Sequence, residues 1–99
     1  MEKKTPHCKL TVVQSMIKAG KVRATLSATM TAAAVGVLGI EAMCKLILSL
    51  TTRNFYKSMT THADHTVWQD VYHGEFNGTR LYVKLTVVDD VLIVSFKEL

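Results

Sequence analysis

The stretch from residue 76 to residue 96, FNGTRLYVKLTVVDDVLIVSF, decides the fold that this sequence predicts. Apolar residues recur at every second position over Thr79–Val88, which is the period of a half-buried β-strand. Asn77-Gly78 before this strand is a strong hairpin signal, and Asp89-Asp90 after it indicates a second tight turn. We therefore expect the next strand to follow at once, over Val91–Phe96.

The two turns predict which residues lie opposite one another. A two-residue turn at Asp89-Asp90 pairs positions whose numbers sum to 179. One face of this hairpin is then apolar, with Val87 opposite Leu92, Leu85 opposite Val94 and Val83 opposite Phe96. The other face is polar, with Thr86 opposite Ile93, Lys84 opposite Ser95 and Tyr82 opposite Lys97.

A two-residue turn at Asn77-Gly78 pairs positions that sum to 155. His73 then lies opposite Tyr82 and Gln69 opposite Thr86, both on the polar face. Asp70 falls opposite Leu85 on the apolar face, an unfavourable place for a carboxylate. This position of Asp70 suggests a slip in the register of the first hairpin.

Earlier in the chain the period of the apolar residues changes from helical to alternating. Helices are predicted at about residues 8–19, before Gly20, and over Glu41–Leu50. Between them a short helix, capped by Ser27 or Thr31, ends near Gly36 or Gly39. Strands are predicted over Phe55–Thr60 and His65–Glu75, separated by a loop at Thr61–Asp64. The order indicates one α+β domain over residues 1–99, with N-terminal helices on a four-stranded antiparallel meander.

The amino-acid composition limits the possible functions but does not identify one. The 99 residues are 48% hydrophobic and carry a formal net charge of +4, which suits an anionic partner or is simply the charge of a basic protein. The only cysteines, Cys8 and Cys44, are not in a CxxC motif, and no apolar leader is visible. We expect a cytoplasmic protein with reduced thiols. The uncharged segment 24–40 is interrupted by Thr, Ser and Gly and falls short of a membrane span.

Few catalytic arrangements fit these residues. His62, Asp64 and His65 with a cysteine are a weak zinc candidate, since no ligand pair stands at zinc spacing. The carboxylates are not clustered, and no glycine-rich phosphate loop or nucleophile elbow is present. What remains is metal-free acid–base chemistry on RNA, for which lysines, a tyrosine and a glutamine on one sheet face are suitable. The competing interpretation is a sheet face that is merely solvated.

Four segments make the sequence familiar: MEKKTPH, FYKSMTT, DHTVWQDVY and DVLIVSFKE. Through them the chain resembles the MqsR family of toxins from toxin–antitoxin pairs, from end to end and least over residues 25–41. The resemblance implies a RelE-like α+β fold and an mRNA interferase that cleaves short GC-containing sites and inhibits translation. It also implies an MqsA-like antitoxin partner, binding of promoter DNA only through the antitoxin, and no metal or cofactor in the toxin.

The resemblance also implies the site. The residues that match the family's proposed active positions are Lys57, Gln69, Tyr82 and Lys97. We expect the lysines to stabilise charge or transfer protons, Tyr82 to act in proton transfer or base stacking, and Gln69 to position the substrate. Substrate contacts of lower rank are expected from His65, His73 and Lys84. Two alternatives stay open: a basic module that binds RNA or a partner without catalysis, and an inactive partner of the antitoxin.

Overall fold

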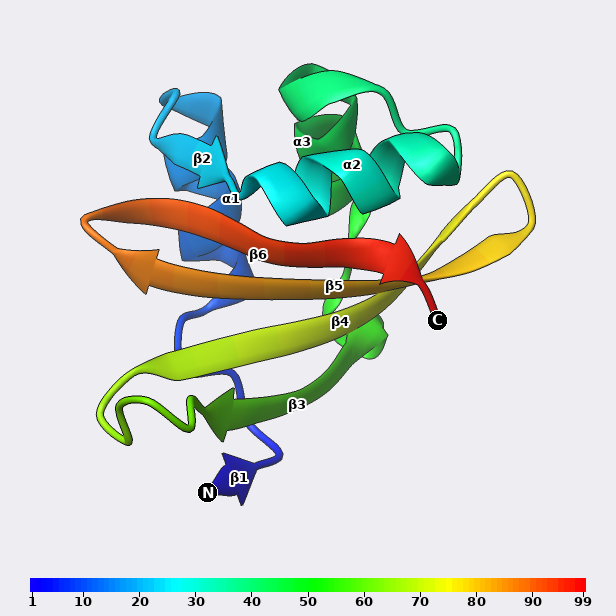
Figure 1. The fold of residues 1–99 in the computed structure, drawn as a ribbon. Helices are drawn as coiled ribbons and strands as arrows, with labels where there is room; N and C mark the ends of the chain where they lie inside the picture. Colours follow the sequence, from blue (N-terminus) through cyan, green and yellow to red (C-terminus); the bar gives the residue numbers. More distant parts are fainter.

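The protein, described over residues 1–99 in a computed structural model, is a mixed sheet covered by helices on one face (Figure 1). The sheet has six strands in the order β1-β3-β4-β5-β6-β2. The strands are β1 (Glu2–Lys3), β2 (Val22–Ala24), β3 (Phe55–Thr60), β4 (Trp68–Phe76), β5 (Thr79–Val88) and β6 (Asp90–Glu98). The helices are α1 (Leu10–Lys18), α2 (Leu26–Ala34), α3 (Gly39–Ser49) and the 3-10 helix η1 (Thr52–Asn54). The predicted α+β class is confirmed.

Strands β3 to β6 form the predicted antiparallel meander, but the sheet extends beyond it at both edges. Strand β1 pairs antiparallel with β3, and β2 pairs parallel with β6. A bidentate contact between Arg23 and Asp90, at 2.6 and 3.1 Å, accompanies the parallel pair. The prediction of four strands was therefore incomplete, because two- and three-residue strands are too short to show an alternating pattern.

Strand β4 begins at Trp68 rather than at the predicted His65. The loop before it is held by its own hydrogen bonds, and Asp64 Oδ1 accepts from both the backbone N–H and the hydroxyl of Thr66, at 2.9 and 2.6 Å. The backbone N–H of Thr61 donates to Val67 O across the loop at 3.1 Å. These local bonds replace the ladder that a longer strand would have formed.

The predicted register of the first hairpin is correct from Asp70 to Phe76. Asn77 and Gly78 both have positive φ, at 49° and 83°, as a tight two-residue hairpin turn requires. Asp70 therefore does lie opposite Leu85. Its two carboxylate oxygens accept hydrogen bonds from the backbone N–H groups of His7 and Cys8, at 2.9 and 3.0 Å, so each oxygen of this buried carboxylate has a partner. The suspected register slip was wrong.

The second hairpin follows its predicted register only at the end away from the turn. Tyr82 pairs with Lys97 and Lys84 with Ser95 as expected. A bulge after Lys84 then shifts the partners by one residue, giving the three pairs Leu85–Ile93, Thr86–Leu92 and Val87–Val91. The predicted partners of Leu85, Thr86 and Val87 were therefore wrong. The apolar run Val91–Val94 has no alternation that could have fixed its register.

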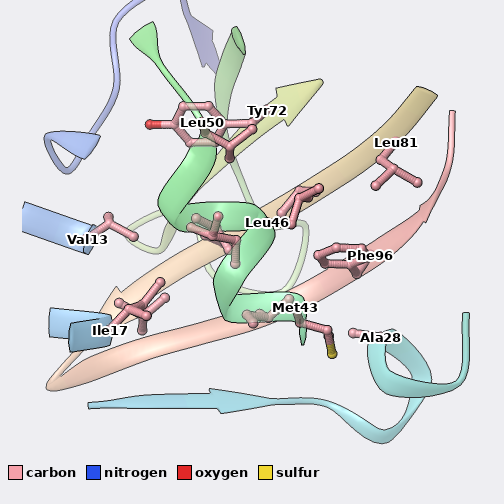
Figure 2. Packing of buried hydrophobic residues seen from close by; sticks show 14 of the residues in the cluster. Val13, Ile17, Ala28, Met43, Leu46, Leu50, Tyr72, Leu81 and Phe96 are labelled. Atoms are coloured by element: carbon pink, nitrogen blue, oxygen red, sulfur yellow. The ribbon is translucent and has the colours of Figure 1, made fainter. Parts of the chain in front are cut away.

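The helices pack their apolar stripes on one face of the sheet. Buried side chains come from α1 (Val13, Ile17), α2 (Ala28, Ala32), α3 (Met43, Ile47) and the sheet (Tyr72, Leu81, Val83, Phe96) in a cluster of 17 residues, most of them drawn in Figure 2. The cap of α2 is Thr25, whose Oγ1 accepts from Ala28 N–H at 3.0 Å, and not the predicted Ser27 or Thr31. Thr31 instead donates to Phe96 O at 2.6 Å, joining α2 to β6.

None of the helices alone has the length and hydropathy of a membrane span; α2 and α3 reach them only when taken together, with a bend of 79° between them.

Candidate functional site

The sheet face opposite the helices carries a row of side chains that crosses four strands. His73 on β4 lies opposite Tyr82 on β5, and Tyr82 lies opposite Lys97 on β6. The ring centroids of His73 and Tyr82 are 6.2 Å apart, and Lys97 Nζ lies 5.3 Å from the centroid of the Tyr82 ring. Tyr56 on β3 completes the row by stacking on His73, with centroids 4.3 Å apart and planes inclined by 22°. We call Tyr56, His73, Tyr82 and Lys97 the aromatic row.

Tyr56 reaches this face because β3 is irregular at its start. Phe55 lies opposite Tyr72, whereas Lys57 lies opposite Val71, so one additional residue is accommodated between them. The bulge lets Tyr56 and Lys57 both lie on the open face while Phe55 stays with the core, in edge-to-face contact with Tyr72. Lys57 Nζ lies 5.5 Å from the centroid of the Tyr56 ring.

Lys57 forms an ion pair with Glu2 of the edge strand β1. Its Nζ donates to Glu2 Oε2 at 2.6 Å, and this hydrogen bond raises the pKa of Lys57 and lowers the pKa of Glu2. The pair is exposed, so its contribution to stability is small. Its consequence for chemistry is that Lys57 remains a fixed cation beside the aromatic row.

A second line of residues runs beside the aromatic row: Lys57, Val71, Lys84 and Ser95 lie opposite one another on successive strands. Val71 is fully buried although it is on the face that no helix covers. Burial lowers the pKa of Lys84, and the charge of Lys97 lowers it further. This face is therefore packed and cationic, which distinguishes it from a merely solvated sheet surface.

His73 lies at the centre of the aromatic row with an unusual environment. Burial lowers its pKa, with a smaller contribution from the charge of Arg80, so the imidazole is neutral at neutral pH. Its Nε2 is buried and has no hydrogen-bond partner. A neutral ring stacked on Tyr56 holds the tyrosines on either side of it apart without adding charge.

The structure brings together most of the predicted site residues. Lys57, His73, Tyr82, Lys84 and Lys97 share the open face. Gln69 lies opposite Met59, four residues along β4 from His73, which is roughly 13 Å at 3.3 Å per residue. His65 is in the loop before β4 and is not part of the sheet face.

Sequence reasoning did not find Tyr56 or Glu2. Tyr56 depends on the bulge in β3, and Glu2 on the pairing of β1 with β3, neither of which alternation reveals. The available signal for Tyr56 was its place in FYKSMT, next to Lys57 and at the start of a strand.

Neither metal binding nor thiol chemistry is suggested by the remaining residues. No group of three or more His, Cys, Asp or Glu side chains lies close enough together to hold a metal ion. Both cysteines are free and half-buried, and burial raises the pKa of each thiol, which disfavours the nucleophilic thiolate.

Together these features define a small α+β protein with a cationic and aromatic face on an open sheet. A family model described as "Motility quorum-sensing regulator, toxin of MqsA" matches residues 5–98. The chain is also 51% identical over 98 residues to "mRNA interferase toxin MqsR" of Escherichia coli (strain K12), a match that covers 99% of each chain. The protein belongs to the MqsR toxin family, and the resemblance seen in its sequence segments is confirmed.

Proposed function

We propose that this protein is the toxin of a toxin–antitoxin pair and acts as an endoribonuclease on mRNA. The Escherichia coli relative, which matches nearly the whole chain, is named an mRNA interferase toxin, and this name supports the activity. The observation that carries the proposal is the open face, where Lys57 and Lys97 flank a row of aromatic rings. Such a surface suits an RNA strand, whose bases stack on rings and whose phosphates contact cations.

The chemistry proposed is attack of a ribose 2′-oxygen on the adjacent phosphorus. The 2′-O–P bond forms while the P–O5′ bond breaks, and the products are a 2′,3′-cyclic phosphate and a 5′-hydroxyl. One proton leaves the 2′-hydroxyl for a base, and another is delivered to the departing 5′-oxygen. Negative charge grows on the phosphoryl oxygens, and fixed cations stabilise it.

Individual roles follow from the environments of the side chains. Lys57 stays protonated beside Glu2, so we assign it and Lys97 to stabilising the charge on phosphorus. Lys84 is the lysine whose surroundings favour the neutral amine, and it is the better proton acceptor. We assign Tyr82 to stacking on a base or to donating a proton. Gln69, farther along β4, positions a neighbouring nucleotide.

The more specific parts of the proposal, namely the cleavage site, the cellular effect and the partner, rest on the resemblance to the family. We propose cleavage at short GC-containing sites and inhibition of translation in the cytoplasm, where the two free thiols would stay reduced. An MqsA-like antitoxin neutralises the protein, and promoter DNA is bound only through that antitoxin. The description of the matching family, toxin of MqsA, supports the antitoxin partner.

Induced expression tests this proposal. Growth should arrest when the protein is expressed alone and resume when the antitoxin is co-expressed, with cellular mRNA shortened during the arrest. A binding module without catalysis would shift RNA in a gel, with an affinity that falls with salt, and leave the strand intact. Intact mRNA during growth arrest would reject the nuclease in favour of that alternative.

A further inference from the structure

A groove on the helix side of the sheet lies close to the aromatic row. It has a volume of about 500 Å³, within the range of small-ligand sites, and is enclosed by the N-terminal segment, α1, the end of α3 and the start of β3. Leu10, Leu50, Phe55 and Tyr72 form its apolar floor. Gln14 fixes two of its walls, because its side-chain amide donates to Ile47 O and Leu50 O, at 3.1 and 3.0 Å.

The floor contains a polar atom without a partner. The Tyr72 side chain is fully buried, and its hydroxyl makes no hydrogen bond within the protein. In Figure 2 the oxygen of Tyr72 is directed away from the centre of the hydrophobic cluster, and Tyr72 lines the groove together with Leu50. Burial, and less strongly the charge of Asp70, raises the pKa of this phenol, so it stays protonated. An unpartnered buried hydroxyl is costly, and an acceptor on a bound ligand would satisfy it.

The mouth of the groove is cationic. Lys4 and Lys9 are exposed there, no acidic side chain lines the groove, and neither lysine takes part in the two ion pairs of the structure. Lys4 also connects the groove to the aromatic row, since its Nζ lies 5.4 Å from the centroid of the Tyr56 ring. Adjacent residues of β3 thus serve two surfaces: Phe55 lines the groove, and Tyr56 belongs to the row.

We propose that this groove binds a nucleotide of the RNA substrate that flanks the cleavage site. Its base packs against Phe55 and Tyr72 and accepts a hydrogen bond from the Tyr72 hydroxyl, while its phosphates contact Lys4 and Lys9. This inference rests on the proposed function, because it extends the same RNA strand from the open face round the start of β3, where Phe55 and Tyr56 do not pair with β1. The groove then contributes affinity and sequence preference beyond the residues that react.

Binding of fully 2′-O-methylated RNA, which lacks the attacking hydroxyl, tests the groove separately from catalysis. The probes are a GC-containing decamer and its central tetramer, measured by fluorescence anisotropy. The aromatic row crosses three strand spacings, roughly 14 Å, so the tetramer covers the row and the decamer extends past it. We expect Tyr72→Phe to reduce the preference for the decamer about three- to tenfold, the effect of losing one hydrogen bond.

Charge and filling variants complete the experiment. Lys9→Gln should weaken decamer binding and lower its salt dependence by about 0.7 in log–log slope, whereas Lys18→Gln, at the other end of α1, should do neither. Thr11→Trp, which fills the groove, should abolish the preference for the decamer.

Two results would overturn the proposal. In the first, Tyr72→Phe and Thr11→Trp both keep the wild-type preference for the decamer over the tetramer, and Tyr72→Phe has a raised melting temperature. That result would mean that the hydroxyl is simply unsatisfied in the fold. The other is unchanged RNA binding in Lys9→Gln together with weaker antitoxin binding, which would assign the groove to a protein. Cleavage of unmodified RNA by the wild-type protein is scored separately, so a failure of the nuclease proposal is distinguishable from a failure of the groove.

Discussion

The two faces of this sheet are built from neighbouring residues of the same strands, but one face forms the core and the other carries the candidate site. Phe96 is fully buried under the helices, whereas Lys97, the next residue of β6, lies over the ring of Tyr82 on the open face. Tyr72 and His73 divide in the same way on β4. Alternation along a strand therefore assigns the core and the candidate site together, and one register determines both.

Each face contains one side chain that is unlike its neighbours. The helix-covered face contains the carboxylate of Asp70, which is tolerated because two backbone N–H groups donate to it. The open face contains Val71, fully buried among lysines. A face is thus defined by how its groups are partnered and covered, rather than by polarity alone.

The largest effect should come from shortening a side chain on the covered face. Phe96→Ala removes a fully buried ring and should lower the free energy of unfolding by about 3–5 kcal/mol. The adjacent Lys97→Ala should change it by no more than about 0.5 kcal/mol. Urea unfolding followed by circular dichroism measures both, and similar losses in the two variants would refute the division between faces.

Activity should respond in the opposite way. Tyr82→Phe and Lys97→Ala should each lower the rate of RNA cleavage by about 100-fold, the scale of losing a proton-transfer group or a charge-stabilising group. Lys45→Ala, on the exposed side of α3, is the control and should cleave normally. Gel-based cleavage rates decide this, and wild-type rates in both row variants would move the site elsewhere.

A smaller loss of stability is expected from the charge within the covered face. Asp70→Ala leaves the N–H groups of His7 and Cys8 without their acceptor and should cost about 1.5–3 kcal/mol. Hydrogen exchange of these two amides should accelerate in the variant. Unchanged exchange would show that the carboxylate does not hold the N-terminal segment against the sheet.

The smallest expected effect is on the pH dependence of stability, through His73 at the centre of the open face. Because burial lowers the pKa of His73, the unfolded chain binds a proton more readily than the folded one. His73 therefore makes stability decrease as the pH falls below its ordinary value of 6.5 towards the lowered value, and contributes no pH dependence well above 6.5. Urea unfolding between pH 7.5 and pH 5 should show a shallower decline in His73→Phe than in the wild type. Parallel declines would exclude a neutral imidazole at His73.

Sequence reasoning found what one strong turn could fix. Asn77-Gly78 set the β4–β5 register, and with it the opposition of His73 and Tyr82. The pairing of Tyr82 with Lys97 was also correct, although the predicted two-residue turn at Asp89-Asp90 was wrong. Asp90 is already part of β6, and the bulge after Lys84 compensates for the shorter turn.

What could not be predicted depends on irregular or very short elements. Strands β1 and β2 consist of two and three residues, and tertiary pairing rather than periodicity creates them. The approach of Glu2 to Lys57 and the stacking of Tyr56 on His73 both follow from such features. The sequence thus predicted three of the four members of the aromatic row, His73, Tyr82 and Lys97, and the irregular start of β3 supplied Tyr56.

In the proposed function the open face cleaves RNA through its own side chains. The most direct measurement is cleavage of a GC-containing RNA by the purified protein in EDTA, with the product ends identified by mass spectrometry. Cleavage should be undiminished and leave 2′,3′-cyclic phosphate and 5′-hydroxyl ends, and it should be lost in Lys57→Ala and Tyr82→Ala variants that remain folded. Cleavage that EDTA abolishes, or that persists in both variants, would contradict the proposed function.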